Sequence, residues 1–287
     1  MTETILITGA AKRIGRQLAL DLAAAGHDIV IHCNTSRDAA EEVAGEIRTR
    51  GRKAFIVMGD LSRPEVPERL MADAVAGAGP ITVLINNASV FEPDDVGEIT
   101  LESWTGHLDT NLRAPIMLSQ AFGRQLPKDR HGNIINIIDQ RVWKLNPRFF
   151  SYTMSKTGLW TATRTLAQAL APRIRVNAIG PGPVLANVDQ TPEDFAAECA
   201  ATPLGRATLP QEIADAVRFI IDAPAMTGQM IALDGGQHLA WEGGSTAASA
   251  SSLRTMASKP FSAGSTMNWL HCHSLSSGPR TRMKSPT

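Results

Sequence analysis

The chain has 287 residues, of which 43% are hydrophobic, and it is therefore long and apolar enough to bury one sizeable core. Lysine and arginine number 28, as do aspartate and glutamate, so the net charge at neutral pH is zero. This balance argues against nucleic acid or an anionic membrane as a partner. Only 5% of the residues are aromatic, and no nucleic-acid-binding motif is present. We therefore expect a small molecule as the partner.

The cysteines and the N-terminal residues indicate in which cellular compartment the protein is expected. Cys33, Cys199 and Cys272 are widely separated and form no Cys-x-x-Cys spacing, which argues against a disulfide framework and against a zinc site. The first eight residues run into a strand pattern without a basic and then apolar leader, and no apolar run reaches the length of a membrane span. We expect a cytoplasmic protein without a bound metal.

Short runs of β-branched and aliphatic residues recur along the chain, separated by helical patterns. These runs cover 5–7, 29–31, 54–57, 83–85, 133–138, 175–179 and 229–233. Nearly continuous apolar strands are typical of a parallel sheet that is buried on both faces. The sequence predicts an α/β fold with a single Rossmann-type doubly wound parallel sheet, flanked by helices in three layers.

The first helix and the C-terminal segment set the limits of this domain. Residues 13–25 place Ile14, Leu18 and Leu22 on one stripe, and Gly26 follows as a C-cap. After Trp241 the chain becomes Ser-rich, with few aliphatic residues. We therefore predict a catalytic domain over residues 1–241 and a disordered tail over residues 242–287.

The first strand ends in a glycine-containing turn that opens the first helix. Backbone N–H groups and the helix dipole attract a pyrophosphate at such a junction, although a purely structural tight turn is the alternative. The usual middle glycine of the motif is replaced by Arg13, beside Lys12, which adds positive charge. The residues expected at the cofactor phosphates are Gly9, Lys12, Arg13, Ile14 and Gly15.

The end of the second strand indicates which nicotinamide cofactor is used. Residues 32–37 contain no Asp or Glu to bind a ribose 2′-hydroxyl, as NAD enzymes do, and this favours NADP. The candidates around the 2′-phosphate are Arg13, His32, Asn34, Ser36 and Arg37. The alternative is that Lys12 and Arg37 are solvated surface charges.

Several motifs in order make residues 4–240 resemble the short-chain dehydrogenase/reductase family. Beyond the turn at 8–15, these motifs are Asp60-Leu61, Asn86-Asn87-Ala88, Asn111, Tyr152-Thr-Met-Ser-Lys156 and Pro181-Gly182. The resemblance implies that Asp60 and Leu61 border the adenine. It also implies that Asn87 and Ala88 line the ribose and nicotinamide path, and that Pro181 and Gly182 shape the nicotinamide side. Turn chemistry alone would also explain each motif singly.

Tyr152 and Lys156 are four residues apart, so a helix presents both on one face. An ammonium beside a phenol stabilises the phenolate, and we expect Lys156 to lower the pKa of Tyr152 toward the working range. Tyr152 is the only tyrosine in the chain. By resemblance, Lys156 also holds the nicotinamide ribose and Asn111 anchors a proton-relay water. A polar residue that bends a helix is the alternative for Asn111.

The fifth strand ends in Asp139, where most of the family has a serine that donates a hydrogen bond to a substrate carbonyl. An ionised aspartate cannot donate, so carbonyl reduction fits this position less well than protonation of a ring nitrogen. The replacement resembles the pteridine reductase and dihydromonapterin reductase subgroup. By that resemblance, Asp139 acts with Tyr152 and Lys156, whereas a strand-end cap is its alternative.

The segment after the fourth strand adds to this second resemblance. It implies that Phe91 stacks on a pterin ring and that Ser89 contacts ring polar groups and the cofactor. A core aromatic residue beneath a loop is the alternative for Phe91. The segment 185–206 lies where such folds carry a substrate lid, and no substrate is predicted from it.

We therefore expect an NADPH-dependent oxidoreductase that reduces a dihydropterin by hydride transfer, with Tyr152, Lys156 and Asp139 serving proton supply. Dihydromonapterin, dihydrobiopterin and dihydrofolate remain open as substrates. One alternative is a reductase of ketones or 3-oxoacyl thioesters. Another is a catalytically silent NADPH-binding sensor. The family resemblance further implies a homotetramer.

Overall fold

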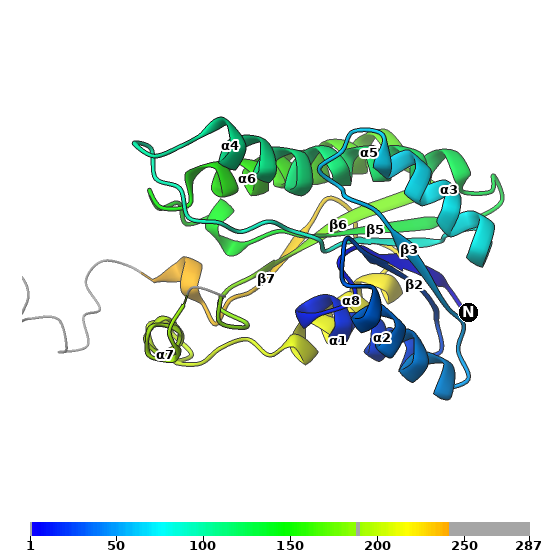
Figure 1. Ribbon diagram of the computed structural model, residues 1–287, viewed down its shortest axis with the longest axis horizontal. Coiled ribbons are helices and arrows are strands. Elements are labelled where there is room, and N and C mark those ends of the chain that lie inside the picture. The colour runs from blue at the N-terminus through cyan, green and yellow to red at the C-terminus, as the bar shows by residue number, and fades with distance from the viewer. Residues whose placement is uncertain (1, 188–189, 241–287) are drawn as a thin grey trace, which may run out of the picture. The chain divides into compact units, whose positions relative to one another are not determined.

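The computed structural model describes residues 2–187 and 190–240 of the chain, and the tail predicted over 242–287 lies outside them. A single sheet of seven parallel strands runs through the described part (Figure 1). Its spatial order is β3-β2-β1-β4-β5-β6-β7. The strands are β1 Thr4–Ile7, β2 Asp28–Cys33, β3 Ala54–Met58, β4 Val83–Asn86, β5 Gly132–Ile137, β6 Ile174–Pro181 and β7 Met230–Leu233.

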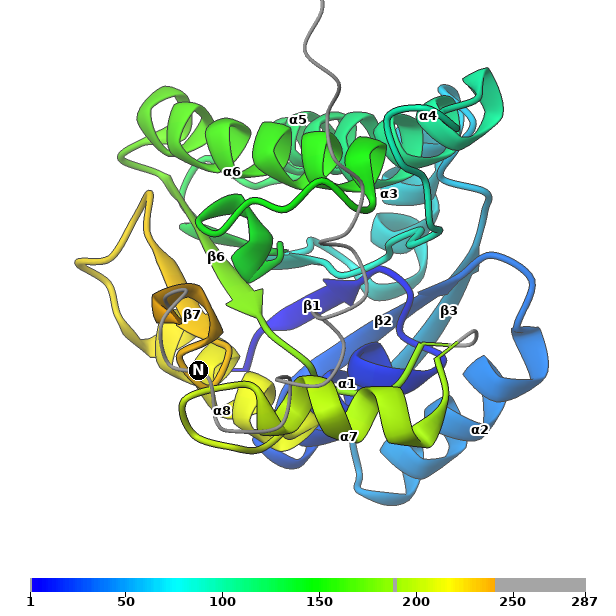
Figure 2. The same ribbon diagram turned by 90° about the vertical axis from the view of Figure 1, so that its left-hand side faces the viewer.

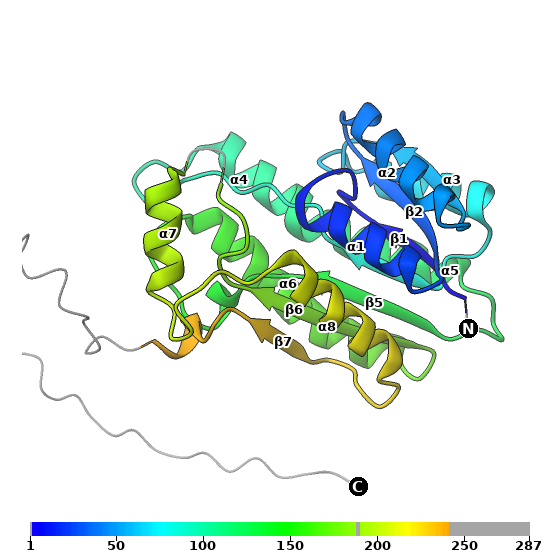
Figure 3. The same cartoon turned by 90° about the horizontal axis from the view of Figure 1, so that it is seen from below.

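Helices cover both faces of this sheet. On one face lie α1 Arg13–Ala24, α2 Arg37–Thr49 and α8 Pro210–Asp222, and seen from below α1 and α8 lie side by side (Figure 3). On the other face lie α3 Val66–Ala78, α5 Ala114–Gln125 and α6 Phe150–Leu170, with α4 Leu101–Leu108 packed on α6. The predicted three-layer Rossmann-type architecture is confirmed.

The apolar runs of the sequence become strands that are buried on both faces. Ile5 and Ile7 face one core layer with α1, whereas Leu6 faces the other layer with α3 and α5. Leu18 and Leu22 of α1 have no exposed surface, and burial of each stabilises the fold by about 1.5–3 kcal/mol. The helix ends at Ala24, and Gly26 follows at φ 98°, a conformation that favours glycine.

The order of the strands determines where a site can form. The chain winds outward from β1 to β3, then returns to place β4 on the other side of β1. Ligands of doubly wound sheets bind outside the carboxyl ends of the strands at such a reversal. The turn after β1 and the segments after β4, β5 and β6 all lie at this edge. Helix α7, Pro192–Ala200, lies on the same side of the molecule, in front of α1 (Figure 2).

A ladder of buried amides ties the sheet to the helix that carries Tyr152. Asn86 Nδ2 donates to Asn136 Oδ1 over 2.8 Å, and Asn136 Nδ2 donates to Thr163 Oγ1 of α6 over 2.9 Å. Asn136 and Thr163 have no exposed surface, so these hydrogen bonds are shielded from competing water. The ladder therefore fixes α6 relative to β4 and β5.

Three short helical turns complete the described elements: η1 Asp109–Arg113, a π-helical turn, and the 3₁₀ turns η2 Gln140–Val142 and η3 Gln237–Leu239. Within residues 2–187 and 190–240, no helix combines the length and the apolar character needed to cross a membrane.

Candidate active site

The turn between β1 and α1 forms a tight cradle. Gly9 has φ 64°, and a Cβ on Gly15 would lie only 2.2 Å from the Gly9 carbonyl oxygen. Asn87 Nδ2 donates to the carbonyl oxygens of Thr8 and Gly9 over 2.8 and 3.2 Å. The Thr8 hydroxyl accepts from the backbone N–H groups of Asn87 and Ala88, both over 2.9 Å. Side chains after β4 therefore hold the turn after β1 in place.

The cradle has the donors that a pyrophosphate requires. In the described part of the chain, the backbone N–H groups of residues 12–15 make no hydrogen bond to a protein acceptor. Lys12, the N-cap, provides no side-chain cap. These N–H groups stand at the positive end of the α1 dipole, where an anion is favoured. The residues present therefore fit the phosphates of a dinucleotide.

His32 was expected at the 2′-phosphate, but its side chain is buried and bonded to backbone groups. It is 2% exposed, its Nδ1 accepts from the Gly9 N–H over 3.2 Å, and its Nε2 lies 3.0 Å from the Gly59 carbonyl oxygen. Both ring nitrogens are thus engaged by backbone groups, and burial lowers the pKa of the imidazole. His32 braces the turn after β1 from β2 and leaves no ring nitrogen for a phosphate.

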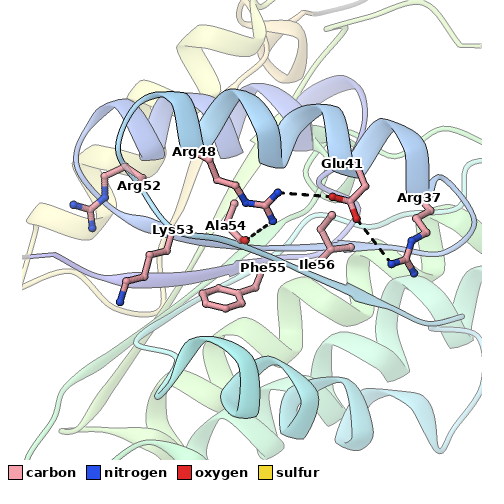
Figure 4. Close-up of a pocket in the computed structure, with 8 residues that line it drawn as sticks. All are labelled: Arg37, Glu41, Arg48, Arg52, Lys53, Ala54, Phe55 and Ile56. Atoms are coloured by element: carbon pink, nitrogen blue, oxygen red, sulfur yellow. Dashed lines mark hydrogen bonds and ion pairs between the residues drawn. The ribbon is translucent and has the colours of Figure 1, made fainter.

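Most of the other 2′-phosphate candidates lie at the surface. Arg13, Asn34 and Arg37 are exposed, whereas Ser36, the N-cap of α2, is half-buried and makes no side-chain cap. Lys12, expected at the cofactor phosphates, is exposed as well. Arg37 lies at one end of a groove between α2 and β3, where Glu41 bridges it to Arg48 at 3.9 and 3.8 Å (Figure 4). Because exposed pairs of this length are weak, the Arg37 guanidinium is available to a phosphate.

Arg13 has partners in the segment that follows β6. Its φ is 53°, in the left-handed region, and its guanidinium donates to the carbonyl oxygens of Ala186 and Leu185 over 3.0 and 3.1 Å. The turn after β1 is therefore linked to the segment that follows β6.

Asp60 and Leu61, expected at the adenine, both make contacts within the protein itself. Asp60 Oδ1 accepts from the Ser62 N–H over 2.9 Å and from the Ser62 hydroxyl over 2.7 Å, which holds the pKa of the carboxyl below its usual range. Leu61 is 5% exposed and packs in the core with α3. Contact of either residue with adenine stays a prediction.

Strand β6 ends at Pro181, and Gly182 follows it at the same edge of the sheet. A Cβ on Gly182 would lie 2.7 Å from the Asp234 Cα, and the Gly182 N–H donates to the Leu233 carbonyl oxygen over 3.0 Å. Only glycine allows this close approach between the segments after β6 and β7. Their place beside a nicotinamide also stays a prediction.

The structure brings Asp139, Tyr152 and Lys156 together. The Tyr152 hydroxyl donates to Asp139 Oδ2 over 2.9 Å, and the Arg141 N–H donates to Asp139 Oδ1 over 2.8 Å. Tyr152 is 6% and Lys156 2% exposed, and the Asp139 side chain is 19% exposed. Lys156 Nζ donates to the Ile137 carbonyl oxygen over 3.0 Å. Asp139 also accepts from the Arg141 N–H as the N-cap of η2, so the predicted strand-end cap is present as well.

The expected effect of Lys156 on Tyr152 is wrong for this geometry. Burial, followed by the charge of Asp139, raises the pKa of Tyr152 well above 10. Lys156 Nζ lies 5.6 Å from the centre of the Tyr152 ring and is bonded to a backbone carbonyl instead. Burial lowers the pKa of Lys156 to about 8 and raises that of Asp139. Burial therefore makes the phenol and the carboxyl both harder to ionise than they are in water.

Asn111 lies in the π-helical turn η1 with its side chain fully used. Its Oδ1 accepts from the Val90 N–H over 2.8 Å, and its Nδ2 donates to the Val90 carbonyl oxygen over 2.9 Å and to Ser155 Oγ over 3.2 Å. It joins the segment after β4 to α6. The predicted relay water stays a prediction, and the π-helical turn agrees with the alternative of a helix-distorting polar residue.

Phe91 is half-buried and forms a wall beside Tyr152. The centre of its ring lies 4.6 Å from that of Tyr152 in an edge-on arrangement and 4.3 Å from that of Phe149 in a near-parallel stack. The Arg141 guanidinium covers Phe149 at 5.0 Å. Ser89 is exposed, and its hydroxyl donates to the Val90 carbonyl oxygen over 3.2 Å.

Phe149 and Arg141 were not singled out from the sequence. Phe149 has φ 55°, a left-handed conformation that is costly for an aromatic residue and that occurs mostly at functional sites. A Phe directly before the helix of Tyr152, and an Arg two residues after Asp139, were the available signals.

Comparison with known proteins settles the family. A family model described as short chain dehydrogenase matches residues 3–196. The chain belongs to the short chain dehydrogenase family. The resemblance seen in the ordered motifs is thereby confirmed.

Known relatives of this short chain dehydrogenase add detail. The FolM alternative dihydrofolate reductase 1 of Brucella suis, solved in complex with NADP, is 50% identical, with a TM-score of 0.82 over 84% of this chain and 96% of that protein. A blue fluorescent protein from a metagenomic library, solved with NADPH, is 29% identical, with a TM-score of 0.76 over 82% of this chain and 97% of that one. A 3-oxoacyl-[acyl-carrier-protein] reductase of Synechocystis is 33% identical over 82% of this chain and 96% of its own length.

These neighbours bear on the cofactor and on the type of enzyme. The chain is an oxidoreductase of the short chain dehydrogenase family, and its cofactor is NADP(H). The predicted cofactor is confirmed.

Proposed function

We propose that this oxidoreductase reduces a dihydropterin, of the dihydromonapterin or dihydrobiopterin type or dihydrofolate. The observation that carries the proposal is the hydrogen bond from Tyr152 to Asp139 beside the Phe91 ring. A pterin ring offers N–H groups that a carboxylate accepts and a flat face that stacks on an aromatic ring. The FolM protein of Brucella suis, named an alternative dihydrofolate reductase, supports this substrate class.

The residues of the chain have distinct roles in the proposed reaction. Bound NADPH supplies the hydride that reduces a ring C=N bond. The turn at residues 12–15 would bind the cofactor phosphates, and Arg37, Asn34 and Ser36 would hold its 2′-phosphate. Lys156 and Asn87 line the path toward the nicotinamide.

Proton supply falls to the pair formed by Tyr152 and Asp139. The nitrogen of the reduced C=N bond requires one proton, and Tyr152 Oη or a water linked to Asp139 provides it. Burial raises the pKa of both groups, so each holds its proton more firmly than it would in water. The positive charge of Lys156 stabilises the negative charge that remains on the pair when the proton leaves.

A second candidate is reduction of a 3-oxoacyl thioester or another ketone, and the name of the Synechocystis relative favours it. A ketone substrate requires a hydrogen-bond donor at its oxygen. Tyr152 is such a donor, but Asp139 accepts both hydrogen bonds that its carboxyl makes here. The silent sensor lacks a supporting observation, since the described site holds Asp139, Tyr152 and Lys156 together. A homotetramer is likewise our proposal, and a cytoplasmic location stays a prediction.

NADPH oxidation, followed by its absorbance, tests this assignment with dihydrobiopterin, dihydromonapterin and an acetoacetyl thioester in parallel. We expect pterin turnover by the wild type and its loss in Tyr152→Phe and Asp139→Ser. Thioester turnover that survives or rises in Asp139→Ser, with no pterin turnover by the wild type, would assign the ketone reaction. NADPH binding without any turnover would favour the sensor.

A further inference from the structure

A buried network of three polar side chains lies behind the wall formed by Phe91. Asp94 follows Phe91 in the loop after β4, His107 lies at the end of α4, and Ser151 lies in the first turn of α6, next to Tyr152. Asp94 is 3% exposed, and His107 and Ser151 have no exposed surface. The three side chains come from separate segments and meet only in the folded chain.

The contacts assign every polar hydrogen of this network. His107 Nε2 accepts from the Glu92 N–H over 3.1 Å, so the proton of the neutral ring is on Nδ1. Nδ1 then donates to Ser151 Oγ over 2.6 Å, and the Ser151 hydroxyl donates to Asp94 Oδ2 in a very short contact. Asp94 Oδ1 accepts from the Ser151 N–H over 3.1 Å. The donors thus point in one direction, from Glu92 through His107 and Ser151 to Asp94.

This direction excludes a hydrolytic role for the three residues. A serine nucleophile donates its proton to a histidine, whereas here the serine accepts from His107 and donates to Asp94. Ser151 Oγ is moreover closed to solvent. The network therefore has a structural role: it holds together the segments that carry its three residues.

Those elements carry the wall of the candidate active site. His107 fixes the backbone at Glu92, directly after Phe91, and Asn111 fixes it at Val90, directly before. The Phe150 N–H donates to the Asp94 carbonyl oxygen over 2.8 Å, which binds the same loop to the start of α6. Phe91 is therefore held on both sides in the chain, against the helix that presents Tyr152.

We propose that Asp94, Ser151 and His107 are positioning residues that hold the Phe91 ring at its angle to Tyr152, and so shape the slot for a flat substrate ring. The inference rests on the proposed function for the identity of that ring. Phe149 stacks on one face of Phe91, so a substrate ring would use the other face, and at the interplanar angle of 74° between Phe91 and Tyr152 its edge would meet the phenol. A shift of the loop by about 1 Å would misplace that edge and cost on the order of 100-fold in rate.

The test uses substitutions that reverse the direction of the hydrogen bonds while nearly keeping the shape of the side chain. In Asp94→Asn the amide donates toward Ser151 Oγ, which must then donate to His107 Nδ1 and force the proton onto Nε2, against the Glu92 N–H. His107→Gln keeps one acceptor and one donor without a titratable ring, whereas His107→Leu removes both. Ser119→Ala is the matched control, because Ser119 is fully buried and its hydroxyl donates to the Pro115 carbonyl oxygen over 2.7 Å, within α5.

Three measurements are made on the full chain: amide hydrogen exchange at Glu92, the Kd of NADPH, and kcat/KM on whichever of dihydrobiopterin or acetoacetyl thioester the wild type reduces. Asp94→Asn and His107→Leu are expected to speed exchange at Glu92 and to lower kcat/KM by about 10- to 100-fold, with an unchanged Kd for NADPH. His107→Gln and Ser119→Ala are expected to stay within about threefold of the wild type.

The pH profile separates positioning from a general loss of stability. Burial lowers the pKa of His107 despite the facing carboxylates of Asp94 and Glu92, and the nearby ammonium of Lys156 lowers it further. Protonation in acid places a hydrogen on Nε2 against the Glu92 N–H, so we expect KM to rise in the wild type only at a pH below the ordinary imidazole pKa of 6.5, and His107→Gln to remove this rise.

The proposal is overturned if exchange at Glu92 is unchanged in Asp94→Asn, or if it rises without any change in kcat/KM. If the wild type reduces neither substrate, the proposed function fails. The network is then tested by Glu92 exchange and by the near-ultraviolet titration of Tyr152, the only tyrosine. Under the proposal both differ from the wild type in Asp94→Asn and match it in His107→Gln, and equal values in all variants overturn it.

Discussion

The hydroxyl of Tyr152 donates its hydrogen bond to the carboxylate of Asp139 over 2.9 Å, and not toward Lys156. A phenol that faces a buried carboxylate is harder to ionise than a phenol that faces an ammonium. The ionisation of Tyr152 therefore depends on Asp139 as well as on Lys156.

Asp139→Asn tests this relationship directly. The change removes the negative charge but retains an oxygen that accepts from Tyr152, so we expect the pKa of Tyr152 to fall toward 10. Near-ultraviolet absorbance measures it without ambiguity, since the chain has one tyrosine. Pterin reduction should fall by about 100-fold or more. An unchanged titration would show that burial alone raises the pKa, and Tyr152→Phe provides the blank.

Arg37→Ala is expected to lower the preference for NADPH over NADH by roughly tenfold, because a charge-assisted contact with the 2′-phosphate is lost. Arg48→Ala is the matched control, since both arginines pair with Glu41 along the same groove (Figure 4). The ratio of kcat/KM with NADPH to kcat/KM with NADH, measured for each variant, shows whether Arg37 contacts the 2′-phosphate. Equal ratios in both variants and the wild type would make Arg37 a solvated surface charge.

Gly15→Ala should weaken NADPH binding and lower the melting temperature together. The added Cβ would lie 2.2 Å from the Gly9 carbonyl oxygen and 2.7 Å from Asn87 Nδ2, so the cradle must open. In Gly45→Ala, within α2, the Cβ meets nothing within 4 Å, and helix propensity favours alanine by about 1 kcal/mol. Calorimetry and NADPH fluorescence measure both effects. A Gly15→Ala protein with wild-type affinity would contradict the assignment of the cradle.

Lys156→Met should reveal the cost of burying an ammonium. The pKa of Lys156 falls from 10.5 to about 8 on folding, so between these pH values the unfolded chain binds a proton that the folded chain releases. Stability of the wild type relative to the variant should therefore rise by on the order of 3 kcal/mol as pH increases through this interval, with the full cost present below it. Denaturant titrations of both proteins at several pH values measure the difference. A difference that stays constant would contradict the lowered pKa.

The sequence predicted the sheet and the central pair well, for physical reasons. Continuous apolar runs such as Ile5–Ile7 leave no exposed face, and the spacing of Tyr152 and Lys156 places both on one side of a helix wherever that helix lies. The phosphate turn followed from the same local logic, because its glycines and its helix start are neighbours in the chain.

Contacts between distant segments were not predictable in this way. The expected effect of Lys156 on the pKa of Tyr152 was wrong because burial and the charge of Asp139 raise that pKa. The ammonium instead bonds to the Ile137 carbonyl oxygen, a group that no side-chain pattern reveals. His32 was assigned to a phosphate, but its ring nitrogens meet the backbone of Gly9 and Gly59. Phe149 joined the wall through a left-handed backbone conformation that depends on the path of the chain before α6.

The braces around the phosphate turn have a consequence for the thermodynamics of cofactor binding. His32 from β2 and Asn87 from the end of β4 already hold the turn in the shape that its unpaired N–H groups require. A loop that is ordered beforehand loses little conformational entropy when its ligand arrives, so more of the contact energy appears as affinity. A mutation that loosens the His32 brace should therefore make NADPH binding entropically less favourable while leaving the groups expected to touch the cofactor in place.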